Sequence, residues 1–252
     1  MRGLFGFVLL AVLTAVLPGA GRAASSDCIL DNCADKKPLS APDGAQSEPR
    51  DRDRPGPRGP SVPGQFDFYV FSLSWSPGFC QTGGDEKGRD QCRAGTGLGF
   101  VVHGLWPQYE HGFPSDCPGV QRAPSRIALS ATDGVYPDEG LARYEWRKHG
   151  TCSGLSPTDY FAAAKAARDS IAVPQPFKAP HQSQNWTPVD IERAFIAANP
   201  RLKPGMLAAI CQRGVLEEVR ICFSKDLKEF RDCPDVTRAR CRAGDVSVPP
   251  ER

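Results

Sequence analysis

The chain has almost no excess of charge, and it has no apolar run long enough to span a membrane. Its 252 residues carry a formal net charge of only +2. A protein that holds nucleic acid mainly by neutralising phosphates is usually more basic, so composition does not indicate such a partner. The longest apolar run, Leu4 to Leu17, has 14 residues, whereas a membrane-spanning helix needs about 20. The chain also shows no internal repeat.

Motifs that bind metal ions are missing as well. The chain has four histidines and ten cysteines, but no two cysteines have the C-x2-C spacing and no two histidines have the H-x3-5-H spacing of zinc sites. The sequence has no cluster of aspartates and histidines like the metal-binding sets of metal-dependent phosphodiesterases, so this class of enzyme is disfavoured. We therefore expect no metal and no other cofactor.

Residues 1–23 are typical of a secretory signal peptide. Arg2 precedes the apolar run, and small residues follow it, with Gly21 and Ala23 at the two positions that the peptidase reads. A membrane anchor is the alternative, but the run is short for one. Export predicts a periplasmic or secreted protein with no membrane anchor after cleavage, and we expect a monomer.

The ten cysteines all follow residue 23, so an exported chain would carry them as disulfides. A zinc site is the alternative, and the spacing disfavours it. The short interval between Cys28 and Cys33 could close a small loop. The sequence by itself does not fix how the other eight cysteines pair.

Residues 24–64 form a segment rich in proline and charge, with almost no large apolar residue, and we expect a flexible linker there.

The folded domain is predicted over 65–252. Within it, Phe66–Trp75 has the apolar density of a buried central strand, and Leu98–Val102 predicts a second strand that ends at His103. Val215–Phe223 predicts a half-buried strand with Glu218 and Arg220 on its polar face.

Helix starts are equally clear. Ser156 or Thr158 can begin an alanine-rich helix that runs to about Ile171. Thr187, followed by a proline and then an aspartate, resembles a capping box and starts a second helix. Strands and helices alternate without regular spacing, which predicts an α+β domain.

His103 and His149 lie in unusual surroundings. His103 follows an apolar strand, where a reactive side chain could be held rigidly. If the segment before His149 is helical, Glu145 and Lys148 lie on the same face as His149, and Gly150 ends the helix. Both histidines could instead be structural, and the charged face could simply be solvated. The other two, His111 and His181, lie among polar and turn-forming residues, as solvated loop histidines do.

Two histidines, a lysine and a glutamate suffice to cleave RNA through its own 2′-hydroxyl. One imidazole can remove the proton of that hydroxyl and the other can protonate the departing 5′-oxygen. Lysine, with help from a carboxyl group, can stabilise the phosphorane that forms between the two steps.

Two segments, HGLWP at 103–107 and YEWRKHGTC at 144–152, resemble the active-site signatures of the ribonuclease T2 family, and Phe66–Cys80 resembles its first core strand. The resemblance covers about Gln65 to Cys241. It implies an α+β fold with a central, largely antiparallel sheet flanked by helices and held by disulfides. It also implies metal-independent cleavage of RNA through a 2′,3′-cyclic phosphate.

The resemblance also implies roles for residues. His149 would be the general base, His103 the general acid, and Glu145 and Lys148 would stabilise the phosphorane. Tyr144 stands where many family members have a histidine that is thought to assist phosphate binding. Tyrosine can donate a hydrogen bond there but carries no positive charge.

Further implications concern disulfides and the bound base. The implied pairs are Cys80–Cys92, Cys117–Cys152, Cys211–Cys241 and Cys222–Cys233, each contributing about 2–4 kcal/mol.

Trp106 could stack on a base or could equally belong to the core. Gln108 could touch the base, and Trp146 is assigned to the core. A protein that binds RNA without cleaving it is the alternative function, and Tyr144 is its only support.

Overall fold

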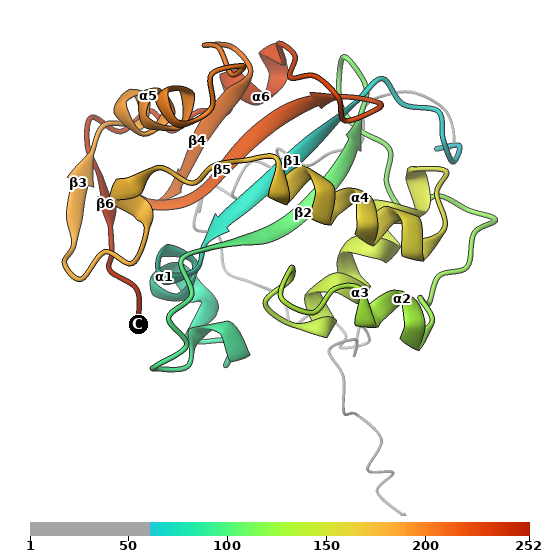
Figure 1. The fold of residues 1–252 in the computed structure, drawn as a ribbon, viewed down its shortest axis with the longest axis horizontal. Coiled ribbons are helices and arrows are strands. Elements are labelled where there is room, and N and C mark those ends of the chain that lie inside the picture. Colours follow the sequence, from blue (N-terminus) through green and yellow to red (C-terminus); the bar gives the residue numbers. More distant parts are fainter. Residues whose placement is uncertain (1–60) are drawn as a thin grey trace, which may run out of the picture. The chain divides into compact units, whose positions relative to one another are not determined.

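The computed structural model describes residues 61–252, and its centre is a six-stranded sheet. The strands follow the order β2-β1-β5-β6-β3, with β4 paired to β5 (Figure 1). The predicted signal peptide, nearly all of the predicted linker, and Cys28 and Cys33 lie outside the described residues. The strands are β1 (Phe68–Trp75), β2 (Phe100–Gln108), β3 (Gln184–Trp186), β4 (Leu207–Gln212), β5 (Val215–Ser224) and β6 (Val246–Val248).

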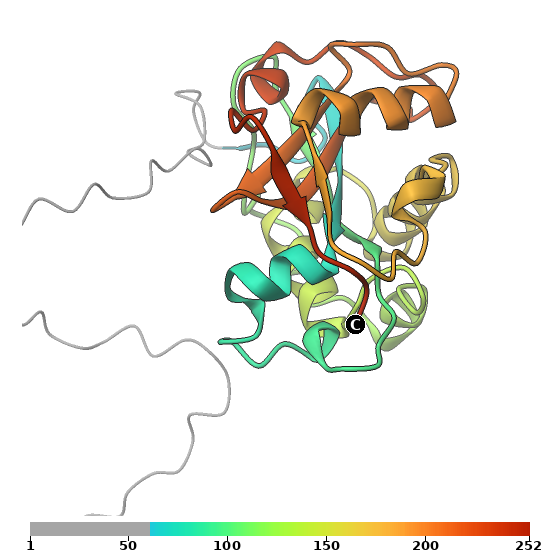
Figure 2. The same ribbon diagram turned by 90° about the vertical axis from the view of Figure 1, so that its left-hand side faces the viewer.

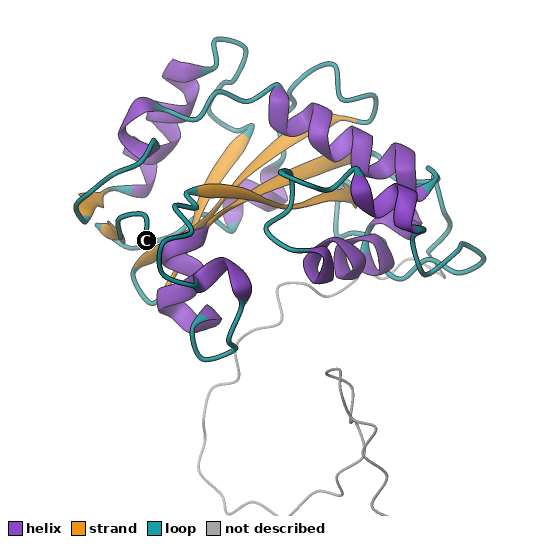
Figure 3. Ribbon diagram, turned by 60° about the horizontal axis from the view of Figure 1, so that its bottom comes forward, coloured by secondary structure: helices purple, strands orange, loops and turns teal. Residues whose placement is uncertain are grey.

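All strand pairs in this sheet are antiparallel except β5 and β6, which run parallel over the single pair Val215 and Ser247. Figure 3 shows the strands as one layer with helices on both sides. The prediction of an α+β fold with a largely antiparallel sheet is therefore confirmed.

Two helices begin at predicted capping residues, the first at Ser156 and not at Thr158. The side chain of Ser156 accepts the N–H of Asp159 at the start of one helix, and Thr187 accepts the N–H of Asp190 at the start of another. No helix within residues 61–252 combines the length and the apolar character that a membrane crossing needs. The helices are α1 (Ser76–Phe79), α2 (Arg126–Ser130), α3 (Glu139–Lys148), α4 (Pro157–Asp169), α5 (Pro188–Ala198) and α6 (Pro234–Arg238).

The main core lies between one face of the sheet and the helices α4 and α5, which Figure 2 shows on the same side of the sheet. Alternate residues of β1, from Tyr69 to Trp75, point into this core. The same core includes Phe161 of α4 and Phe195 of α5, both fully buried. Burial of these aromatic side chains fixes the helices on the sheet.

The opposite face of the sheet carries a smaller apolar cluster. Phe68 and Val70 of β1 pack there with Trp106 of β2 and Val236 of α6. Both faces of β1 are thus covered, and all eight of its residues are buried. This explains why its sequence is apolar without alternation, as predicted for a central strand.

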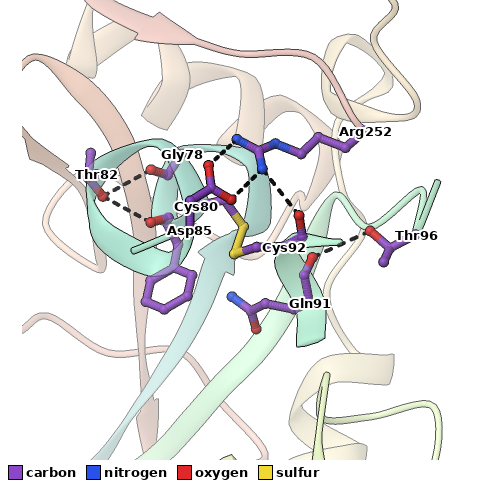
Figure 4. The surroundings of a disulfide bond; sticks show 9 residues. Gly78, Cys80, Thr82, Asp85, Gln91, Cys92, Thr96 and Arg252 are labelled. Carbon is purple, nitrogen blue, oxygen red and sulfur yellow. Dashed lines mark hydrogen bonds and ion pairs between the residues drawn. A yellow bond between two sulfur atoms is a disulfide. The ribbon is translucent and has the colours of Figure 1, made fainter. Parts of the chain in front are cut away.

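Four disulfides hold the described part of the chain, and they confirm the four pairings that the family resemblance implied. The bridge Cys80–Cys92 closes a loop against which Arg252 lies (Figure 4). The Arg252 guanidinium donates to both carboxylate oxygens of Asp85, at 2.5 and 2.6 Å, and to the carbonyl of Cys92. Arg252 is therefore tied to this loop.

Candidate active site

A β-bulge in β2 determines where His103 points. Ser72 of β1 pairs with Gly104, and the next residue, Leu73, pairs with Val102. His103 is therefore an extra residue with no partner in the register. Bulges of this kind re-aim side chains and are frequent beside active sites.

Without the bulge, alternation would put His103 on the same face as Leu105, which is in the main core. Because of the extra residue, Val102 and Leu105 both face that core while His103 faces β5 on the other side. The predicted end of the strand at His103 is wrong, since β2 continues to Gln108. Pro107 is compatible with this strand because β2 is at the edge of the sheet.

The end of α3 carries the second signature. Asp138 caps its N-terminus, and His149 is its C-terminal cap, with its backbone N–H donating to the carbonyl of Glu145 at 2.9 Å. Gly150 was predicted to end the helix but instead starts a 3₁₀ turn. A Cβ on Gly150 would collide with the ring of Trp146, so close packing is the reason for glycine there.

Glu145 joins α3 to β2. The indole N–H of Trp106 donates to Oε2 of Glu145 at 2.7 Å, and Glu145 is only 1% exposed. A Cβ on Gly104 would collide with that carboxylate and with the indole nitrogen. Glycine directly after His103 therefore lets the glutamate and the tryptophan meet.

The two imidazoles converge on one indole. Ring centroids are 5.3 Å apart for His103 and Trp106, and 5.4 Å apart for Trp106 and His149. His103 Nε2 also lies 3.7 Å from Oε1 of Glu145. Although His149 follows His103 by 46 positions in the sequence, the two histidines thus belong to one cluster, and the adjacent Lys148 acts on it through its charge.

Glu218 and Arg220 of β5 complete the cluster, and sequence analysis did not assign them to it. Oε1 of Glu218 is 2.5 Å from Nδ1 of His103, and Oε2 of Glu218 accepts from Nε of Arg220 at 2.7 Å. The Arg220 guanidinium carbon lies 5.0 Å from the ring centroid of Trp106. The sequence placed both residues on the polar face of the strand, but it gave no sign that this face is buried against His103.

The two histidines have opposite pKa shifts. Burial lowers the pKa of His149 well below its ordinary value, and the charges of Lys148 and His103 lower it further. Burial also acts to lower the pKa of His103, but the carboxylates of Glu218 and Glu145 outweigh it and raise the pKa to about 9. At neutral pH His149 is neutral and His103 is protonated.

The two carboxyl groups also differ. Burial raises the pKa of Glu145 to about 7, although the charge of His103 and the hydrogen bond from Trp106 oppose the shift. Burial acts in the same direction on Glu218, but Arg220 and His103 reverse it and hold the pKa well below its ordinary value. Glu218 is therefore ionised beside His103, while Glu145 is partly protonated at neutral pH.

The predicted substrate contacts lie around this cluster with different exposure. Trp106 is 9% exposed, so most of its ring is covered by neighbouring side chains. Tyr144 is 43% exposed on α3, with Nζ of Lys148 5.8 Å from its ring centroid, and Gln108 is half-buried at the end of β2. Trp146 is fully buried, which confirms its assignment to the core.

The other two histidines lie outside the cluster. His111 and His181 are exposed, as predicted. The one group of described residues whose donor atoms could surround a metal ion is Cys80, Asp85 and Cys92. Its two sulfurs are joined in a disulfide and offer no thiolate.

A model of the ribonuclease T2 family matches residues 66–233. The chain belongs to the ribonuclease T2 family. A ribonuclease of Aeromonas hydrophila is 36% identical over 179 residues, covering 70% of this chain and 80% of that relative. Ribonuclease I of Escherichia coli is 28% identical over 210 residues, covering 65% of this chain and 77% of that protein.

Solved structures of the family have the same fold. Ribonuclease MC1 from bitter gourd seeds is 25% identical, with a TM-score of 0.55 over 73% of this chain and 100% of that one. A variant of ribonuclease MC1 in complex with 5′-UMP gives a TM-score of 0.55 and 25% identity over 72% of this chain and 97% of its own. As a family member, the chain is a ribonuclease T2-type RNA endonuclease.

Proposed function

We propose that the chain cleaves single-stranded RNA by attack of the 2′-hydroxyl, forming a 2′,3′-cyclic phosphate that is then hydrolysed to a 3′-phosphate, with low base specificity. The observation that carries this proposal is the packing of both imidazoles on one indole, and the pKa values of the two rings are shifted in opposite directions. Cleavage by this route needs one base and one acid on the same phosphodiester. Groups in one site whose pKa values are driven apart are suited to these two roles.

In this proposal His149 is the general base. Its lowered pKa leaves the imidazole free to accept the proton of the 2′-hydroxyl. His103 is the general acid, because its raised pKa keeps a proton available for the departing 5′-oxygen. In hydrolysis of the cyclic phosphate the roles reverse, with His103 activating water and His149 returning the proton.

Glu145 and Lys148 stabilise the phosphorane. Lys148 supplies positive charge at the end of α3, next to His149. Glu145, with a pKa near neutrality, can donate a hydrogen bond to a phosphorane oxygen when it is protonated. We assign contacts with the substrate to Tyr144, Gln108 and the part of Trp106 that remains exposed.

The chemistry requires no metal ion, because every proton transfer is assigned to a side chain. We further propose that the mature protein is a periplasmic or secreted monomer. Disulfides support an oxidising compartment. The relatives named above include proteins of two bacteria.

Analysis of the ends produced from a defined RNA tests the proposal. Wild-type protein should give 2′,3′-cyclic phosphate ends first and 3′-phosphate ends later, with or without EDTA. An RNA with a single 2′-deoxynucleotide should resist cleavage at that position, because it lacks the attacking hydroxyl. His149→Ala should abolish cyclic phosphate formation without changing the circular dichroism spectrum. Full activity of that variant, or products with 5′-phosphate ends, would contradict the proposal.

A further inference from the structure

Glu218 makes a direct contact with His103, and the proposed function gives Glu218 no role of its own. Its Oε1 is 2.5 Å from Nδ1 of His103, on the side of the ring away from the nitrogen that faces Glu145. Glu218 belongs to β5, two strands from β2, since β1 lies between them. The contact therefore crosses the sheet and ties the bulge at His103 to a central strand.

Both carboxylate oxygens of Glu218 are engaged. Oε1 contacts the imidazole, and Oε2 accepts the hydrogen bond from Arg220 at 2.7 Å. Glu218 is only 5% exposed, so water screens neither contact effectively. A buried carboxylate held by a guanidinium in this way stays ionised and fixed in orientation.

We propose that Glu218 is a positioning residue for the general acid: it fixes the tautomer and the charge of His103, and Arg220 keeps Glu218 in place. This inference rests on the proposed function of His103. With its Nδ1 proton held by Glu218, the imidazole must present Nε2 to the departing oxygen. The arrangement resembles other sites in which a carboxylate orients a histidine that transfers protons.

Other charged groups also act on His103, and the experiment must separate them from Glu218. Glu145 of α3 faces Nε2 of His103. The positive charge of Arg220, on β5, acts to lower the pKa of His103. Glu217, next to Glu218, also interacts with His103 through its charge. His149, in turn, is affected by the charge of His103. Glu217 offers the matched control, because it carries the same charge close by without the direct contact.

The first experiment compares the histidine titrations of Glu218→Gln and Glu217→Gln with wild type by NMR. Glutamine keeps the size of the side chain and removes the charge. Glu218→Gln should lower the pKa of His103 by at least about 1 unit, a tenfold change in its protonation equilibrium, and Glu217→Gln should lower it much less. An unchanged His103 pKa in Glu218→Gln, or equal shifts in both variants, would overturn the inference.

The second experiment separates the acid step from the rest of catalysis. RNA is compared with a nucleoside 3′-(p-nitrophenyl phosphate), whose leaving group departs without needing a proton. Glu218→Gln should shift the alkaline limb of the pH profile on RNA to lower pH by at least about 1 unit, so that kcat/KM on RNA at about pH 9.5 falls about tenfold. The p-nitrophenyl substrate should be cleaved at a rate close to that of wild type. Equal losses on both substrates would show a general structural defect and overturn the inference.

His103→Ala distinguishes failure of this inference from failure of the proposed function. If His103→Ala cleaves RNA like wild type, His103 is not the acid, and the proposed function fails. If His103→Ala loses RNA cleavage but retains cleavage of the p-nitrophenyl substrate, the acid is confirmed. In that case, a Glu218→Gln variant with the wild-type His103 pKa and wild-type activity on RNA would overturn only the role of Glu218.

Discussion

Gly104 of β2 lies directly against the carboxylate of Glu145 from α3, with no space for a Cβ between them. This close approach lets Oε2 of Glu145 accept the indole N–H of Trp106, on whose ring both histidines pack. The geometry of the whole cluster thus depends on the absence of a Cβ at Gly104.

Replacing Gly104 with alanine tests this dependence. The new methyl group must displace Glu145 or the indole, so the two histidines lose their common support. We expect kcat/KM on RNA to fall about 100-fold, the size of loss that a displacement of about 1 Å can cause. We expect the free energy of unfolding to fall by about 1–3 kcal/mol.

Gly244→Ala is the matched control for this substitution. No atom lies within 4 Å of a Cβ at Gly244, and its φ is not in the left-handed region. Its activity and urea midpoint should equal those of wild type. If Gly104→Ala behaves like Gly244→Ala, close packing at Gly104 does not position the site.

The raised pKa of His103 predicts a pH-dependent contribution to stability. Protonated His103 is stabilised in the folded protein, where its pKa is about 9, above the ordinary 6.5. This contribution is fully present below pH 6.5 and is lost as the pH rises to about 9. His103→Gln should remove it. Urea unfolding at pH 6 and at pH 9.5 measures this contribution. The free energy of unfolding should fall more between these two pH values in wild type than in His103→Gln. Equal falls would refute the raised pKa of His103.

The disulfide Cys117–Cys152 should matter for activity beyond its effect on stability. Cys152 lies three residues after His149, and the backbone N–H of Cys117 donates to Oγ1 of Thr151. We expect the double variant Cys117→Ala/Cys152→Ala to lose about 2–4 kcal/mol of stability. It should also lose more than half of its kcat/KM at a temperature where it is folded, because the end of α3 becomes less constrained.

Removal of Cys211–Cys241 gives the comparison, because its sequence separation of 30 is close to the 35 of Cys117–Cys152. Loops of similar length predict similar losses in urea stability. Activity of the folded Cys211→Ala/Cys241→Ala variant should stay near that of wild type. Equal losses of activity in both variants would mean that Cys117–Cys152 has no particular role in placing His149.

Local sequence patterns predicted much of the fold. The caps at Ser156 and Thr187 marked two helix starts, and the apolar density of Phe66–Trp75 marked the central strand. Helical spacing brought Glu145, Lys148 and His149 together correctly, because these residues share a single helix end. These features depend only on residues a few positions apart in the chain, so they can be recognised in the sequence.

Two features of the site depend on pairing between distant segments and were not predicted. The bulge at His103 exists only in the register of β2 against β1, and the sequence of β2 alone suggested a strand that stopped there. Glu218 looked like a solvent-facing residue of β5, and only the strand order β2-β1-β5 brings it to His103. A period-two pattern shows that two residues share a face, but not what covers that face.

Titration of the four histidines of the wild-type protein by NMR tests the central claim most directly. Each signal can be assigned by substituting one histidine at a time. The protonation states given above predict that His149 is neutral and His103 is protonated at pH 7, and that His103 loses its proton only near pH 9. A protonated His149 or a neutral His103 at pH 7 would contradict the assignment of base and acid.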